Sequence, residues 1–335
     1  MKIFVIGLIG IASATGFAAN APLFKESFSK FQVNNTVIHW VAPTNQLCAA
    51  LWTYKVTPQH FKIVAVSNLI TMGSFTMQDE QHGHRVISSS NEDTLFFFSK
   101  ERVCNLTVVP PQGRIEYWDG YAAANHWDKT NHFNELVDGL PSEVQTVELG
   151  LKLLKQFGIN RTDLAQKSDG HLITFGETKT RSYFDRRTQK YIDNEILTRG
   201  IFLNRQIDGV AFAGIGLGGG CEIEFGNHGK IARFNLIWRD LQPYEHYKLA
   251  SRDEIAQLIN DGKAVLTHKN MVNPNDVKTV TITEISPLYM GASENESQDF
   301  VYPFAKLEAT AETGYTNIDI ELYCPILSTN IVSSK

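Results

Sequence analysis

The sequence contains little cysteine, no cluster of basic residues and no long apolar segment after its first residues. Only four of its 335 residues are cysteines, and none form the Cys-x-x-Cys pair typical of zinc sites. Lysine and arginine never occur five in succession, and the formal net charge is −5, so nucleic acid is not expected as a partner. No later segment has the roughly 18 apolar residues that a membrane-spanning helix needs.

Signatures of known catalytic and nucleotide-binding classes are also missing. The sequence has no Gly-x-Ser-x-Gly elbow and no local Cys-His-Asn signature. The glycine-rich residues 214–220 lead directly into the alternating segment CEIEF, whereas a phosphate-binding loop must be followed by a helix. We therefore predict an antiparallel hairpin of residues 221–225 and 230–238, joined by a turn at residues 226–229, and no bound cofactor or metal ion.

The N-terminus has the three-part layout of a secretory signal peptide. Lys2 precedes an apolar stretch at residues 3–11, and small residues follow up to Ala18. We expect residues 1–18 to be removed, leaving a secreted protein without a membrane span. Four sequons predict N-glycosylation, at Asn34, Asn105, Asn160 and Asn295.

The four cysteines are widely separated, which in an oxidising compartment favours two disulfide bonds. Cys48 and Cys104 flank the first group of predicted elements, so we predict that they pair. Cys221 and Cys324 would then form the second bond. Buried free thiols are the alternative interpretation.

Three segments have the apolar stripe and the ends of an amphipathic helix. The first is residues 57–73, with Thr57 as its N-cap, and the second is residues 141–158, capped by Ser142 or Asp138. The third is residues 251–262, which begins with the capping box Ser251 to Glu254.

Strand-like segments follow each predicted helix. This order predicts an α+β fold of three divergent tandem modules, each a single helix packed on antiparallel strands. The modules would be residues 19–140, 141–245 and 246–335. A single large α+β domain is the alternative.

The second predicted module resembles a known family. The segments LNRQIDGVAFAG, NHGKIARFN and WRDL, with a helix before and after, resemble the hairpin of PepSY-type modules, found in propeptides of secreted metalloproteases. The resemblance implies binding, inhibition or folding assistance, and the family has no shared catalytic residues. No protease domain follows in this sequence, so we do not expect a simple zymogen leader.

Two groups of polar residues are candidates for catalysis or metal binding. The segment ANHWDKTNHFNE contains His126, Asp128 and His132, which offer ligands or an acid–base set. His82 and His84 would share one face of a strand. Polar loops or linkers explain both groups as well.

Two pairs of residues are candidates for ligand binding. Arg186 and Arg187 offer bidentate contacts to a carboxylate or phosphate, or form an exposed turn. Trp238 and Arg239, like Trp118 and Asp119, follow a strand-like segment, where the tryptophan is expected to cover the sheet and the charged neighbour to be exposed. A ligand platform is the alternative.

These observations favour a secreted, non-catalytic binding or regulatory protein of PepSY-like modules, with an extracellular protein such as a peptidase as its partner. The alternative is a secreted enzyme that acts on a small metabolite in a cleft between modules.

Overall fold

The computed structural model describes most of the chain after residue 28. The described residues are 29–31, 36–43, 50–57, 61–73, 75, 95–99, 104–120, 122, 139–186, 188–214, 219–266, 272–292, 298–325 and 327–331. They form two compact units, each built from segments far apart in the sequence. Unit 1 takes residues 1–53, 245–287 and 303–335, and unit 2 takes residues 54–244 and 288–302.

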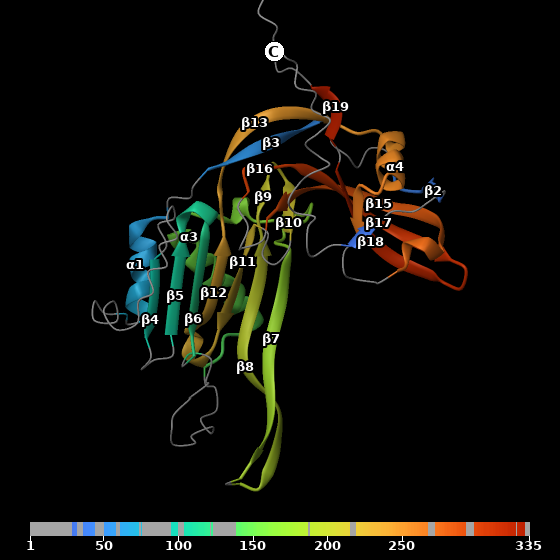
Figure 1. The fold of residues 1–335 in the computed structure, drawn as a ribbon. Coiled ribbons are helices and arrows are strands. Elements are labelled where there is room, and N and C mark those ends of the chain that lie inside the picture. Colours follow the sequence, from blue (N-terminus) through green and yellow to red (C-terminus); the bar gives the residue numbers. More distant parts are fainter. Residues whose placement is uncertain are drawn as a thin grey trace, which may run out of the picture. The chain divides into compact units, whose positions relative to one another are not determined.

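Unit 2 is centred on a seven-stranded sheet, whose neighbouring strands are all antiparallel (Figure 1). In spatial order its strands are β4 (Leu95–Ser99), β5 (Cys104–Val109), β6 (Arg114–Asp119), β12 (Ile231–Ile237), β11 (Gly220–Phe225), β8 (Lys190–Asn204) and β7 (Thr174–Asp185).

Two helices cover one face of this sheet. Helix α1 (Ile63–Met72) and helix α3 (Glu143–Gln156) place Leu69 and Leu154, both with no exposed surface, in one core with Leu106, Ile223 and Phe234 of the strands. Burial of these aliphatic and aromatic side chains is the main stabilising term of the unit.

The ends of the helices test the predicted caps. Ser142 and Gln145 form a reciprocal capping box at the start of α3, which confirms one of the two predicted caps. Helix α1 begins at Ile63, later than predicted, and its N-cap residue Lys62 makes no side-chain cap hydrogen bond. Thr57, the expected cap, instead ends strand β3 (Ala50–Thr57).

The prediction of three tandem helix-on-strand modules is wrong. Strand β6 from the first predicted module pairs with β12 from the second, with Trp118 opposite Arg233 and Ile115 opposite Leu236. Helices α1 and α3 therefore lie on a single, mainly β architecture. Separate modules would have left β6 and β12 as edge strands with unpaired backbone groups, and pairing removes those edges.

The remaining strands of unit 2 lie near the end of β15 (Val277–Gly291). Residues Phe212–Gly214 of β10 (Val210–Gly214) pair with Tyr289–Gly291 in parallel, and β9 (Gln206–Ile207) pairs with β10. Phe300 and Val301 of β16 (Phe300–Val301) pair with β3.

Unit 1 contains a second sheet and one helix. The strands of this sheet are β1 (Ser29–Phe31), β14 (Ala264–Leu266), β18 (Asn317–Pro325), β17 (Pro303–Thr313) and the first part of β15, with β2 (Val37–Trp40) parallel to β15. Helix α4 (Arg252–Asn260) contacts β18 through its buried face, and its Ser251–Glu254 capping box confirms the prediction. Strand β19 (Leu327–Ile331) pairs with the end of β13 (Asp240–Leu249).

Candidate functional site

Strand β11 presents two chemically different faces. Side chains alternate along a strand, so Cys221, Ile223 and Phe225 lie in the core on the helix side. Glu222 and Glu224 therefore project from the opposite face of the sheet. They are only 8% and 3% exposed, which is rare for carboxyl groups and requires dedicated partners.

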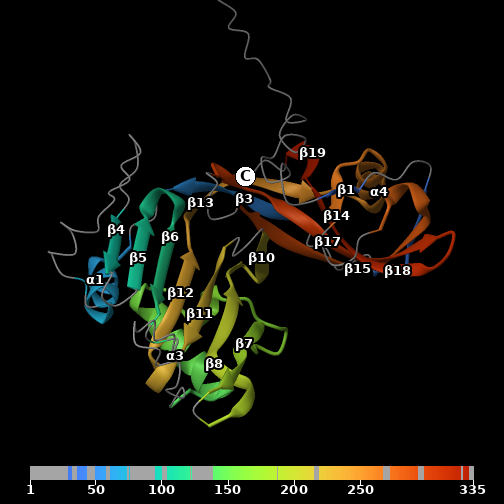
Figure 2. The same cartoon turned by 60° about the horizontal axis from the view of Figure 1, so that its bottom comes forward.

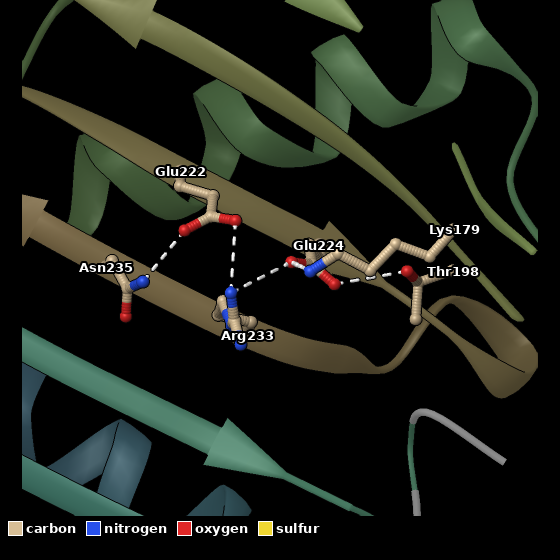
Figure 3. Close-up of polar contacts among 6 residues, drawn as sticks. All are labelled: Lys179, Thr198, Glu222, Glu224, Arg233 and Asn235. Atoms are coloured by element: carbon tan, nitrogen blue, oxygen red, sulfur yellow. Dashed lines mark hydrogen bonds and ion pairs between the residues drawn. The ribbon is translucent and has the colours of Figure 1, made fainter. Parts of the chain in front are cut away.

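Glu224 is held by partners from three neighbouring strands (Figure 3). The Lys179 ammonium on β7 donates to Glu224 Oε1, and the Thr198 hydroxyl on β8 donates to Glu224 Oε2 at 3.1 Å. On β12, Arg233 Nη1 lies 3.6 Å from Glu224 Oε1. The register of β7, β8, β11 and β12 brings these groups together.

Glu222 shares one of these cations. Arg233 Nη1 lies 3.4 Å from Glu222 Oε1, and Asn235 Nδ2 donates to Glu222 Oε2 at 2.8 Å. On β12, Asn235 lies directly opposite Glu222, and Arg233 lies directly opposite Glu224. The contact of Asn235 with Glu222 is therefore a direct cross-strand contact, and that of Arg233 with Glu222 is a diagonal one.

A third carboxylate approaches over a glycine. Glu177 on β7 and Glu224 on β11 both pair with Gly200 of β8, which lies between them. A Cβ atom at Gly200 would lie 3.0 Å from Glu224 Cγ and 3.2 Å from the Ile223 carbonyl oxygen. Because glycine leaves this space empty, carboxylate oxygens of Glu177, Glu222 and Glu224 lie within 4.8 Å of one another. We call these seven residues the carboxylate face: Glu177, Lys179, Thr198, Glu222, Glu224, Arg233 and Asn235.

The two buried carboxyl groups titrate in opposite directions. Burial raises the pKa of Glu222, and a hydrogen bond to Glu224 raises it further, against the effect of Arg233. Burial alone would also raise the pKa of Glu224, but the hydrogen bonds from Lys179 and Glu222 and the nearby cations outweigh it and lower the pKa. A proton held by this pair therefore resides on Glu222, while Glu224 is ionised.

Aromatic side chains border the carboxylate face on both sides. Trp118 pairs with Arg233 and is half-buried. Phe202 pairs with Glu222, and Phe175 on the edge strand β7 pairs with Phe202 and is 60% exposed. We call Trp118, Phe175 and Phe202 the aromatic borders. The surface thus combines fixed polar groups with apolar contact area, as ligand sites do.

The three carboxylates are also the group best suited to a metal ion among the described residues. Oxygen ligands of this kind suit Mg²⁺ or Ca²⁺. However, the cations Lys179 and Arg233 already contact two of the three carboxylates. A divalent ion would have to displace or tolerate them, which makes a singly charged organic cation the better electrostatic match.

A separate cavity of about 350 Å³ lies in unit 2 where α1 and α3 meet the ends of β6 and β11. Its wall contains Asp119, which is only 4% exposed. The Tyr117 hydroxyl donates to this carboxylate at 3.4 Å, and the Ala122 amide donates at 3.3 Å. Asp119 therefore already has structural partners, and the other cavity walls are mostly apolar.

Several predicted site residues lie outside the described residues. These are the catalytic candidates His126, Asp128 and His132, the pair His82 and His84, and one member of the arginine pair, Arg187. Arg186 is described and exposed in the turn between β7 and β8.

Trp238 and Arg239 do not form an exposed platform. Trp238 is 8% exposed, and Arg205 stacks on its ring at 4.8 Å. Arg239 is 5% exposed, and its Nη1 donates to the Ala292 carbonyl and to Gln298 Oε1, each at 3.2 Å. The expectation that the charged neighbours of Trp118 and Trp238 are exposed is wrong, because Asp119 and Arg239 are both satisfied inside the protein.

The predicted Cys221–Cys324 disulfide bond is not formed, and both residues are buried as thiols. Cys104 is also buried, and its predicted partner Cys48 lies outside the described residues. Burial raises the pKa of Cys221 to about 12, so its thiol is protonated and unreactive at neutral pH.

Two of the four sequon asparagines are described. Asn105 is half-buried on β5, and Asn160 is exposed just before a short 3-10 turn. Asn34 and Asn295 lie outside the described residues. Glycosylation and secretion stay predictions, as does the signal peptide, whose residues are not described.

The predicted β11–β12 hairpin is confirmed. Its strands pair antiparallel, and its turn places His228 at φ 54° and Gly229 at φ 65°. The alternation in CEIEF contained the signal for the carboxylate face, since it places two glutamates opposite the core. That signal becomes informative only with the register that sets Arg233 and Asn235 beside them.

Comparisons with known proteins add little to this picture. No family model and no curated protein matches the sequence. A solved structure of an uncharacterized protein from Eubacterium rectale is similar over 90% of each chain, with a TM-score of 0.43 and 10% identity. This similarity carries no argument about fold or function. Among the described residues, no helix has the length and apolar character needed to cross a membrane.

Proposed function

We propose that the protein is a non-catalytic binding protein whose working surface is the carboxylate face. Its ligand is a cationic side chain presented by an extracellular protein partner. The observation that carries this proposal is which carboxylates of the site already contact a cation. Three carboxylates converge within 4.8 Å, and the cations Lys179 and Arg233 contact only Glu222 and Glu224.

Glu177 is the group left for a ligand. Among the described residues, its carboxylate forms no ion pair or hydrogen bond, whereas Glu116 on the same face of the sheet is paired with Arg114 at 2.6 Å. A lysine or arginine of a partner would give Glu177 a charge-assisted hydrogen bond, typically worth about 1.5–3 kcal/mol. The aromatic borders would contact the apolar stem of that side chain.

The rigidity of the site supports binding. Buried carboxylates fixed by neighbouring strands need no reordering when a ligand arrives, so little conformational entropy is lost. A face of a sheet with exposed aromatic side chains also suits a protein partner better than a closed pocket would.

The direct test uses the full chain and two hexapeptide libraries, one with a central lysine and one with norleucine at that position. We expect the lysine library to be retained about tenfold or more better, because norleucine keeps the stem but lacks the charge. The variant Glu177→Gln should abolish this preference. The matched control Glu116→Gln should keep it, since Glu116 already has a partner. Equal retention of both libraries by the parent protein would refute the proposal.

The finer proposal is that the partner is an extracellular peptidase. In a panel of purified secreted peptidases, the parent protein should then bind or inhibit at least one enzyme. The variant Glu177→Gln should neither bind nor inhibit that enzyme. Lysine preference without any effect on such a panel would retain the binding function and reject the peptidase.

A second candidate function is catalysis, favoured by the opposite pKa shifts of Glu222 and Glu224. A protonated and an ionised carboxyl group side by side can act as general acid and general base. The test is turnover of small chromogenic esters, phosphates and glycosides. An enzyme is supported if the rate falls at least about a hundredfold in both Glu222→Gln and Glu224→Gln. If both variants keep the parent rate, this role is rejected.

A further inference from the structure

The β7–β8 hairpin extends well beyond the sheet that contains it. Strand β8 pairs with β11 only from Arg199 to Asn204, so its earlier residues pair with β7 alone. We call residues 180–196 the arm. Figures 1 and 2 show it continuing past the other strands of the sheet. An isolated two-stranded hairpin is only marginally stable, so the arm contributes little to the stability of the fold. A contact with a partner would explain why it extends this far.

Two aromatic side chains are exposed near the end of the arm. Phe184 on β7 lies directly opposite Tyr191 on β8, so both rings are on the same face. They are 53% and 66% exposed, respectively. Adjacent exposed aromatic rings on a projecting element are typical of surfaces that contact a partner.

The same tip is positively charged, although the whole chain has a net charge of −5. Between the paired residues Phe184 and Tyr191, the tip contains three basic residues, Arg186, Arg187 and Lys190, and one acidic residue, Asp185. Asp193 and Glu195 lie further along the arm, where Glu195 pairs with Arg181. The Asp185 carboxylate is buried and accepts a hydrogen bond from the Thr188 hydroxyl at 2.8 Å, which ties it into the turn. Arg186 and Lys190 are exposed. The charge that the tip presents outward is therefore basic.

We propose that the tip of the arm docks onto a bilayer of anionic phospholipids. Phe184 and Tyr191 would lie at the headgroup boundary, where aromatic rings are favoured, and Arg186 and Lys190 would contact lipid phosphates. This surface is separate from the carboxylate face, so the inference goes beyond the proposed binding function.

The small size of the tip favours a lipid surface over an acidic protein. Two aromatic rings offer about 150–250 Å² each, whereas a stable protein interface buries about 800 Å² on each partner. A bilayer needs no complementary shape, and a projecting tip reaches it without other strands of the sheet interfering. Aromatic rings beside cations are the combination that an anionic membrane interface selects.

The test is co-sedimentation of the full chain with vesicles of phosphatidylcholine alone or mixed with phosphatidylserine. We expect binding to the anionic vesicles, weakened by salt because surface charge is screened. The double variant Phe184→Ser with Tyr191→Ser should lose at least about tenfold in affinity. Replacing both Arg186 and Lys190 by Gln should weaken binding about 25-fold, since each basic residue near an anionic surface contributes about a factor of five.

Tyr315 provides a matched control. It is 96% exposed in the turn between β17 and β18, so Tyr315→Ser removes an equally accessible aromatic ring from another hairpin. This variant and Glu177→Gln should bind vesicles like the parent protein. The second of these outcomes separates the present inference from the proposed function.

A further variant keeps the test decisive if the double variants unfold. Tyr191→Trp preserves an aromatic ring and adds one tryptophan to the fluorescence of the parent protein. Vesicles of brominated phosphatidylserine should quench the fluorescence of this added tryptophan. Failure of the parent to bind anionic vesicles overturns the proposal. Parent-like binding by both folded double variants, or binding only to an acidic protein, also overturns it.

Discussion

The two glutamates of β11 should respond in opposite ways to the same substitution. Glutamine keeps the shape of the side chain and removes its charge. For Glu222 it imitates the protonated form that burial already favours, so Glu222→Gln should leave the free energy of unfolding at pH 7 unchanged or raise it. For Glu224 it removes the ionised form on which Lys179 and Arg233 depend, so Glu224→Gln should lower this free energy.

The size of the Glu224 effect follows from its contacts. A hydrogen bond to a charged group contributes about 1.5–3 kcal/mol, against about 0.5–1.5 kcal/mol for a neutral one. The Thr198 hydroxyl can still donate to the amide oxygen of the glutamine, so the main loss is at Lys179. The side chains of Lys179 and Arg233 are 35% and 38% exposed, and water screens part of that loss. We therefore expect a destabilisation of about 1–2 kcal/mol.

Urea unfolding followed by far-UV circular dichroism measures this difference. With a slope of about 2–3 kcal/mol per molar urea, Glu224→Gln should lower the midpoint by about half a molar. Glu116→Gln is the control for removal of a more exposed carboxylate on the same face. The reasoning is refuted if Glu224→Gln is as stable as the parent protein, or if Glu222→Gln is destabilised as much as Glu224→Gln.

Four further predictions follow from single contacts. Because burial raises the folded-state pKa of Glu222, its contribution to stability is complete below its unfolded pKa of about 4.3 and is lost as the pH rises through the folded pKa. In urea titrations, Glu222→Gln should therefore flatten the fall in stability that accompanies a rise in pH above about 4.3. Gly200→Ala should destabilise unit 2 by about 1–3 kcal/mol in thermal unfolding, because its Cβ would lie 3.0 Å from Glu224 Cγ, and a neutral effect would show that the sheet can yield there. Cys221 should react with a thiol reagent only at the rate of unfolding, since it is buried and its pKa is about 12; labelling of the native protein within minutes would contradict this. Ser251→Ala should cost about 1 kcal/mol in chemical denaturation because it removes the N-cap of α4, and Ser251→Asp should recover most of the loss.

Local patterns in the sequence were sufficient for local structure. Ser142 is followed three residues later by Gln145, and Ser251 by Glu254, which is the spacing that a capping box needs, and both serines cap a helix. The turn at residues 226–229 and the alternation of CEIEF defined the β11–β12 hairpin, because turn chemistry and a period of two act over a few residues. The same alternation would have placed Glu222 and Glu224 away from the core.

Pairing between distant strands was decided only by the tertiary structure. The sequences of β6 and β12 contain no signal that the two strands are neighbours. Their pairing, with Trp118 opposite Arg233, nevertheless joins two predicted modules into one sheet. The carboxylate face needs a further distant strand, because Glu177 and Lys179 on β7 reach Glu222 and Glu224 only through the register of β8. Strand order and register depend on which hydrophobic faces are buried together, a property of the whole core that no single segment contains.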